Sequence, residues 1–115
     1  DIARIKKPHN LDGISLWKFL WQEASLSSRP SPMLWIFPEY GGQMAVRMNN
    51  MKAVRRNLKA SKAKWSPWEV YDLANDPAEK KDLAEKRPDI IAAAVKVLRQ
   101  QITPNSVFPM PRPEM

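Results

Sequence analysis

The residues best suited to binding chemistry form a basic run in the middle of the chain. Between positions 47 and 64 every charged residue is basic: Arg47, Lys52, Arg55, Arg56, Lys59, Lys62 and Lys64. The whole chain carries a formal net charge of +7. Such a charge suits nucleic acid, anionic lipid or an anionic substrate, although charge runs often form only a solvated face. The run therefore predicts an anion-facing surface or an ordinary solvated one, in equal measure.

Catalytic side chains are scarce. His9 is the only histidine and cysteine is absent, so neither a histidine-rich zinc site nor thiol chemistry is available. His9 could act as a general base, but no nucleophile or orienting partner accompanies it, which favours a surface or hinge histidine. Three tryptophans could stack on sugar rings, although such residues are more often core or interface anchors: Trp35, Trp65 and Trp68.

Four segments have the composition and alternation of β-strands: 33–37, 43–48, 51–57 and 68–73. Asn49 and Asn50 tolerate left-handed backbone and predict a tight hairpin between the second and third strands. The basic segment after the third strand, residues 58–66, predicts a solvent-facing loop.

Helical patterns flank these strands. An N-terminal helix is predicted from apolar residues at helical spacing: Ile14, Trp17, Leu20 and Trp21. A short helix is predicted over 77–84, with Asp76 as N-cap, Pro77 at the first helical position and Glu79 three residues after the cap. A longer helix starts at Pro88, and its apolar stripe consists of Ile90, Ile91, Ala94, Val97, Leu98 and Ile102.

Together these elements predict an α+β fold, in which a small antiparallel sheet of about four strands packs against a C-terminal helix, with an N-terminal helix in addition. We expect residues 1–32 to be a lead-in and helix, residues 33–103 to be the folded subdomain, and residues 104–115 to be a proline-rich tail.

The segment from Trp68 to Ala84 resembles the C-terminal signature of the sulfatases of the alkaline-phosphatase superfamily, W-E-L-Y-D-L-x-x-D-P-x-E-x-x-N-L-A. Residues 12–16, 34–42 and 43–55 resemble, in the same order, the D-G-x-S/D-L segment, the L-Y-W-E-F-x-E-x-G-G turn and the K-Q-A-V-R-x-G-x-W-K-x-V-R hairpin of that family. The chain departs from the pattern at three places: Ile36 replaces a common acid, Asn49 or Asn50 a glycine, and Met51 a tryptophan.

The resemblance is greatest to arylsulfatases and N-acetylgalactosamine-6-sulfatases. It implies that the chain is the minor domain of an α/β sulfatase, expected to be inactive alone and joined through residues 1–32 to a catalytic domain. In that domain a formylglycine, made from C/S-x-P-x-R, and a calcium ion would act on the sulfate ester. Neither cofactor is expected in this chain: the nearest match, from Ser28 to Pro32, has proline where the motif requires arginine.

The resemblance also implies a place beside the substrate. The minor domain of sulfatases can add residues to the rim of the active site, and the candidates here are Glu39, Tyr40, Gln43 and Arg47. Arg47 could hold a sulfate or uronate in a forked geometry, but pairing with Glu39 or Glu69 across the sheet is the favoured alternative. The substrate would be a sulfated sugar or an aryl sulfate, and the location periplasmic or extracellular in a bacterium.

Two other functions compete with this one. A stand-alone basic module for a polyanion or nucleic acid would have aromatic residues interleaved with the charges, yet no aromatic lies between Met44 and Lys64. We therefore expect no nucleic-acid partner, and no apolar run is long enough to span a membrane. A structural subunit would dock its apolar faces on another chain. Docking on a catalytic domain predicts an exposed apolar patch of several hundred Å² (~300 or more).

Overall fold

The structure is a computed structural model that describes residues 13, 20–21, 31–59, 61 and 64–107. The chain divides into two units, residues 1–30 and 31–115, which we treat separately. In the first unit Leu20 and Trp21 are helical; the rest of the predicted N-terminal helix lies outside the described residues, as do His9 and the start of the Ser28 to Pro32 segment. In the tail, residues 104–107 have no helix or strand, and residues 108–115 are not described.

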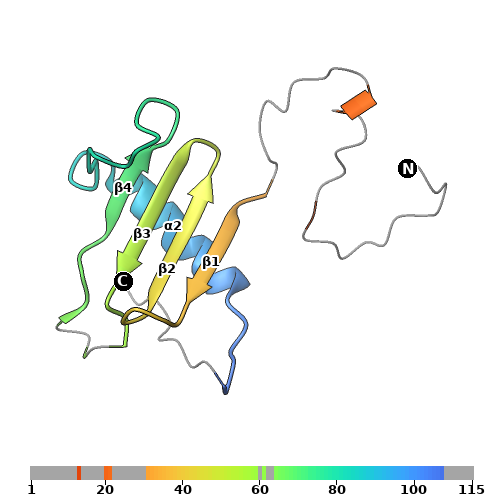
Figure 1. Cartoon of the computed structure of the whole chain (residues 1–115), viewed down its shortest axis with the longest axis vertical. Helices are drawn as coiled ribbons and strands as arrows, with labels where there is room; N and C mark the ends of the chain where they lie inside the picture. Colours follow the sequence, from red (N-terminus) through yellow and green to blue (C-terminus); the bar gives the residue numbers. More distant parts are fainter. Residues whose placement is uncertain (1–12, 14–19, 22–30, 60, 62–63, 108–115) are drawn as a thin grey trace. The chain divides into compact units, whose positions relative to one another are not determined.

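The second unit contains a four-stranded antiparallel sheet whose strand order follows the sequence (Figure 1). The strands are β1 (Met33–Phe37), β2 (Gln43–Met48), β3 (Met51–Arg56) and β4 (Glu69–Asp72). The helix α2 (Pro88–Gln101) lies across one face of the sheet (Figure 1). The predicted α+β architecture and the predicted start of this helix at Pro88 are confirmed.

Strand alternation places the core between the sheet and α2. Met44, Val46, Ala53 and Val70 point toward the helix, where they pack around the fully buried Leu98. Because α2 is amphipathic, its outward side carries exposed polar residues such as Lys96 and Gln100. The inner face of the sheet is thus covered within the chain itself, and the opposite face, which we call the outer face, is not covered by α2.

The turns that join the first three strands depend on left-handed backbone. Asn49 has φ of 54° and forms the tight hairpin that the Asn49-Asn50 pair predicts. Between β1 and β2 three consecutive residues have positive φ: Tyr40 at 49°, Gly41 at 82° and Gly42 at 81°. A Cβ on Gly42 would lie 3.3 Å from the backbone nitrogen of Lys59, so this position requires glycine for space as well as conformation.

The prediction of a solvent-facing loop over 58–66 is wrong at its first residue. Leu58 is only 2% exposed and belongs to the core. Its backbone N–H donates to the carbonyl of Gly42 at 3.0 Å, and that of Lys59 donates to Gly41 at 2.8 Å. These bonds hold the segment against the β1–β2 turn, which is why an apolar side chain at its start becomes buried.

The predicted helix over 77–84 is also wrong: the segment is a series of turns. Glu79 has φ of 52°, which a right-handed helix does not allow. Asp76 accepts a hydrogen bond from the N–H of Lys81 at 2.8 Å instead of capping a helix start. The capping pattern is present in the sequence, but Glu79 reaches Lys52 of β3 at 2.6 Å, and this tertiary contact competes with the helix.

The end of this segment closes the free edge of β4. The N–H of Val70 donates to Oδ1 of Asp82 at 2.9 Å, and the N–H of Leu83 donates to the carbonyl of Val70 at 2.7 Å. The same Asp82 oxygen accepts the N–H of Ala84 at 2.8 Å. Backbone groups that an edge strand would otherwise leave unpaired are therefore bonded by the Asp82-Leu83-Ala84 sequence.

Candidate functional site

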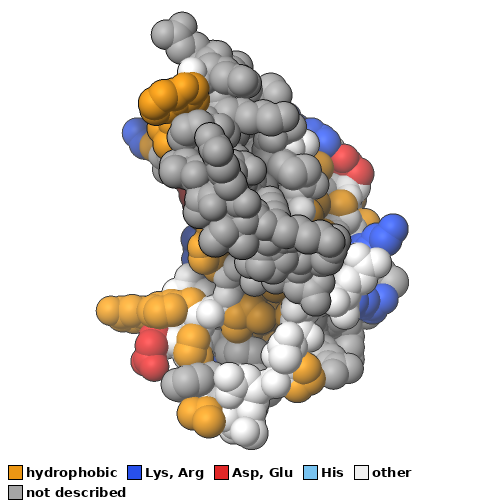
Figure 2. Space-filling view, turned by 90° about the vertical axis from the view of Figure 1, so that its right-hand side faces the viewer, with side chains coloured by type: hydrophobic (Ala, Val, Ile, Leu, Met, Phe, Trp, Pro, Cys, Tyr) orange, Lys and Arg blue, Asp and Glu red, His pale blue; other side chains and the backbone are white. Residues whose placement is uncertain are grey.

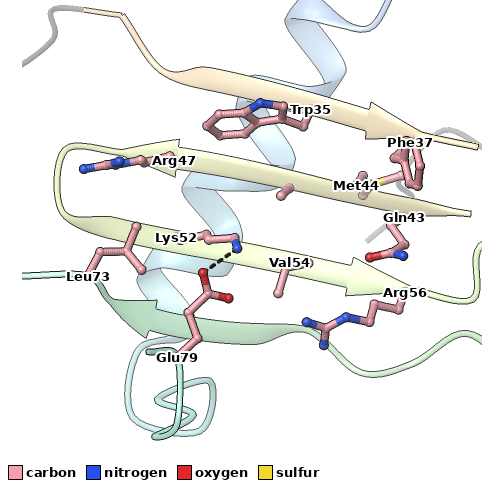
Figure 3. A pocket seen from close by; sticks show the side chains of 11 residues that line it. Trp35, Phe37, Gln43, Met44, Arg47, Lys52, Val54, Arg56, Leu73 and Glu79 are labelled. Carbon is pink, nitrogen blue, oxygen red and sulfur yellow. Dashed lines mark hydrogen bonds and ion pairs between the residues drawn. The ribbon is translucent and has the colours of Figure 1, made fainter. Parts of the chain in front are cut away.

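The candidate site is a hollow of about 440 Å³ on the outer face of the sheet. Figure 2 views the side of the molecule toward which β1 lies, and hydrophobic side chains reach the surface there at several places. Figure 3 shows the hollow with labelled side chains from β1, β2 and β3 and from the turns after β4. Its lining consists of Trp35, Phe37, Gln43, Met44, Ala45, Arg47, Lys52, Val54, Arg56, Leu73 and Glu79.

Two of the three cations in the hollow are neutralised by neighbouring acids. Lys52 Nζ lies 2.6 Å from Glu79 Oε1, and both side chains are about three-quarters buried (Figure 3). Arg56 donates to Oε1 of Glu69 on the adjacent strand. The hydroxyl of Tyr71 donates to the other oxygen of Glu69 at 2.5 Å. One carboxylate therefore holds Arg56 and Tyr71 together on the outer face of β3 and β4.

This three-residue cluster shifts the protonation of its members. Burial raises the pKa of Glu69, but the hydrogen bonds from Arg56 and Tyr71 outweigh it, and the pKa lies below its ordinary value. The hydrogen bond to Glu69 raises the pKa of Arg56. The same bond, together with burial, raises the pKa of Tyr71 to about 12. Arg56 and Glu69 are therefore held as an ion pair, and Tyr71 is held as the neutral phenol that donates to it.

We expect Tyr71 to ionise at about pH 12 rather than near its ordinary value of 10.0. The folded state holds the phenolic proton of Tyr71 more tightly than the unfolded state does. The stability that the Tyr71–Glu69 hydrogen bond contributes is therefore fully present below pH 10 and is lost as the pH rises through about 12. The measurement is the absorbance of tyrosinate against pH, taken as the difference between the wild type and Tyr71→Phe. In Glu69→Gln the midpoint should move toward 10; an unchanged midpoint would show that Glu69 is not the cause.

Arg47 is the third cation, and the pairing favoured from the sequence is wrong. Its Nε donates to the carbonyl of Asn49 at 2.9 Å, whereas Glu69 is bonded to Arg56. Within the described part of the chain, neither Glu39 nor any other acid forms an ion pair with Arg47. Figure 3 shows the guanidinium at the hairpin end of the hollow. Arg47 is thus a half-buried cation with no acid from the described residues beside it.

The four residues predicted to bind substrate fall into two groups. Gln43 and Arg47 both line the hollow, but they lie at opposite ends of β2. Glu39 and Tyr40 are exposed on the turn that precedes Gln43. The Tyr40 ring is 83% exposed and stacks on Phe37, with 6.1 Å between ring centroids. The structure therefore brings Glu39, Tyr40 and Gln43 to one end of the sheet and separates Arg47 from them.

The hollow also includes Trp35, one of the three tryptophans considered for sugar stacking, and residues that were not predicted to belong to a site, Phe37 among them. Trp35 and Phe37 are on the same face of β1 because they are two positions apart, and they are 44% and 48% exposed. That alternation is visible in the sequence and could have identified them as a pair. The Lys52–Glu79 contact joins residues far apart in the chain, and no local pattern predicts it.

The other two tryptophans considered for sugar stacking have a structural role. The guanidinium of Arg55 lies 5.1 Å from the ring centroid of Trp65 and 5.7 Å from that of Trp68. Its Nε donates to the carbonyl of Ser66 at 2.9 Å. Trp65 and Trp68 thus anchor the segment that returns to β4, which agrees with the prediction that such tryptophans are more often structural anchors than sugar-binding residues. Burial lowers the pKa of Arg55. Arg55 is therefore not part of an anion-binding surface.

Among the residues that the structure describes, no three or more His, Cys, Asp or Glu side chains are grouped so that they could hold a metal ion. None of the helical segments it describes combines the length and apolar character needed to cross a bilayer.

Comparison with known proteins identifies the fold. No protein-family profile matches the chain, and no curated protein matches it in sequence. Among solved structures it is similar to part of Ps i-CgsB, which was determined in complex with k-i-k-neocarrahexaose. The TM-score is 0.60 and the sequence identity 23%, over 78% of this chain and 18% of that chain. The chain thus shares its fold with less than a fifth of a longer protein.

Proposed function

We propose that this chain is the C-terminal subdomain of a sulfatase, an enzyme that hydrolyses sulfuric esters. The observation that carries the proposal is an agreement between sequence and fold. Of the segments that resemble sulfatase motifs, those after residue 33 form the strands, hairpin and edge cap of the observed sheet. A fold of this kind also occurs in Ps i-CgsB, whose structure was determined in complex with k-i-k-neocarrahexaose. In this proposal the calcium ion and the formylglycine nucleophile belong to a catalytic domain outside residues 1–115, and the complete enzyme is periplasmic or extracellular.

The subdomain has two roles in this proposal. It completes the fold of the catalytic domain, and its β1–β2 turn lies at the rim of the substrate site. Tyr40 supports the second role because a bulky residue at φ of 49° is strained, and such strain is common at functional sites. An exposed ring beside Glu39 and Gln43 can stack on a sugar while the polar groups bind its hydroxyls. Arg47, which was predicted to bind substrate together with these residues, lies at the other end of β2.

The alternative of a stand-alone module for polyanions or nucleic acid has weaker support. Three cations of the basic run are committed within the fold: Lys52 to Glu79, Arg56 to Glu69, and Arg55 to two tryptophans. The run therefore does not form one uninterrupted basic face over the described strands.

The test is sulfate release by the complete polypeptide encoded around this chain. We expect it to contain the C/S-x-P-x-R motif and to release sulfate from a sulfated oligosaccharide or an aryl sulfate. Tyr40→Ala should raise KM for the oligosaccharide several-fold with little change in kcat, because a ground-state stacking contact is lost. Val107→Ala, at a similarly exposed position, is the control. A polypeptide that lacks the motif, or that releases no sulfate from either substrate, would contradict the proposal.

A further inference from the structure

The outer face of the sheet has the side chains of a surface that is meant to be covered. An antiparallel sheet packed on one side normally carries polar residues on the other. Here the outer face presents Trp35 and Phe37, each nearly half exposed. Beside them lie Ala45 on β2, which is partly exposed, and Val54 on β3, which is already buried at 4% exposure. The register pairs Trp35 with Ala45 and Ala45 with Val54, so these three residues form a continuous apolar band across the strands.

The charges beside this band are arranged so that burial is inexpensive for all but one. Lys52 and Arg56 are already paired with Glu79 and Glu69, and a paired ion loses less on desolvation than a lone one. Arg47 stands directly opposite Lys52 in the strand register. Since Lys52 is neutralised and Arg47 is not, a covering surface that supplies one carboxylate opposite Arg47 would balance the whole face.

We propose that the outer face docks on the catalytic domain of the same polypeptide, with an acidic residue of that domain bound to Arg47 and an apolar cluster over Trp35 and Phe37. The inference rests on the proposed function and adds to it the docking face and its chemistry. Two observations support this occupant: Arg47 forms no ion pair with the described acids of the outer face, and the fold occurs as 18% of a longer chain in Ps i-CgsB. The outward side of α2 is the other candidate face, and its exposed Lys96, Arg99 and Gln100 do not suit a buried interface.

The first experiment is hydroxyl-radical footprinting with mass spectrometry of the complete polypeptide and of the 115-residue chain. Trp35 and Phe37 are expected to be oxidised readily in the 115-residue chain and several-fold more slowly in the complete polypeptide. Equal oxidation in both would show that the face stays open. Equal protection in both would show that this chain covers its own face. Either result overturns the inference, as does a coding sequence with no domain before Asp1.

The second experiment isolates Arg47. In the complete polypeptide Arg47→Glu is expected to restore several-fold faster oxidation of Trp35 and to lower the melting temperature. The control Lys96→Glu makes the same charge change on the outward side of α2 and should do neither. If Arg47→Glu raises KM but leaves Trp35 protected, Arg47 binds substrate and the inference fails while the sulfatase proposal stands. If the face is protected but no sulfate is released, the sulfatase proposal fails and the docking face remains.

Discussion

Leu98→Ala is expected to lower the free energy of unfolding by about 3 kcal/mol, the largest single effect that we predict for this chain. Leu98 is fully buried in the last turn of α2, where it belongs to the same core cluster as Met44, Val46 and Val70. Truncation removes apolar area and leaves a cavity between two rigid elements, helix and sheet, that cannot easily close. Urea denaturation of the 115-residue chain, followed by far-ultraviolet circular dichroism, measures the change.

Lys96→Ala is the matched control for this prediction. It lies two residues away in the same helix, and its side chain is exposed, so we expect a change within about 0.5 kcal/mol. If Leu98→Ala does not fold, Leu98→Val gives a smaller loss in the same direction. A loss under about 1 kcal/mol for Leu98→Ala would mean that α2 is not packed on the sheet in solution.

Asp82→Ala is expected to lower the free energy of unfolding by about 2 kcal/mol, because a charged acceptor for two backbone N–H groups is lost. One of these N–H groups belongs to Val70, whose residue is fully buried. The effect should be local: hydrogen exchange at the Val70 and Ala84 amides should become faster, while the amides shared by β2 and β3 stay protected.

Asp82→Asn is the discriminating variant, because an amide oxygen can still accept both hydrogen bonds. We expect it to retain more than half of the stability that alanine loses. Equal losses for the two variants would show that the charge of Asp82, rather than its hydrogen bonds, stabilises the edge of β4.

The parts of the fold that the sequence predicts correctly are those fixed by local pattern. Strand alternation, the Asn49-Asn50 turn and the apolar stripe after Pro88 each act over a few residues, and all three are present in the structure. The predictions are wrong where contacts between residues far apart in the sequence determine the local structure. Over 77–84 a good capping sequence does not form a helix, because Glu79 bonds to Lys52, 27 positions away.

The candidate site was predicted only in part for the same reason. The turn that carries Glu39 and Tyr40 and the strand that carries Gln43 and Arg47 are where the sequence predicts them. The hydrogen-bond and ion-pair partners of the charged residues differ from those predicted. Arg47 donates a hydrogen bond to the backbone carbonyl of Asn49, two residues ahead. Glu69 forms its ion pair with Arg56 on the neighbouring strand. Those choices depend on the register of β3 and β4, which composition and charge alone do not specify.

The consecutive order of the strands has a consequence for how the chain folds during synthesis. Each strand pairs with its neighbour in sequence, so most contacts span short loops, and the hairpins can form one after another as the chain leaves the ribosome. The covering helix is made after the four strands. Until Pro88 and the residues after it emerge, the inner side chains of β2, β3 and β4 remain open to water and to other nascent chains. A stalled or truncated product that ends before α2 is therefore the form of this protein most exposed to aggregation and to chaperone binding.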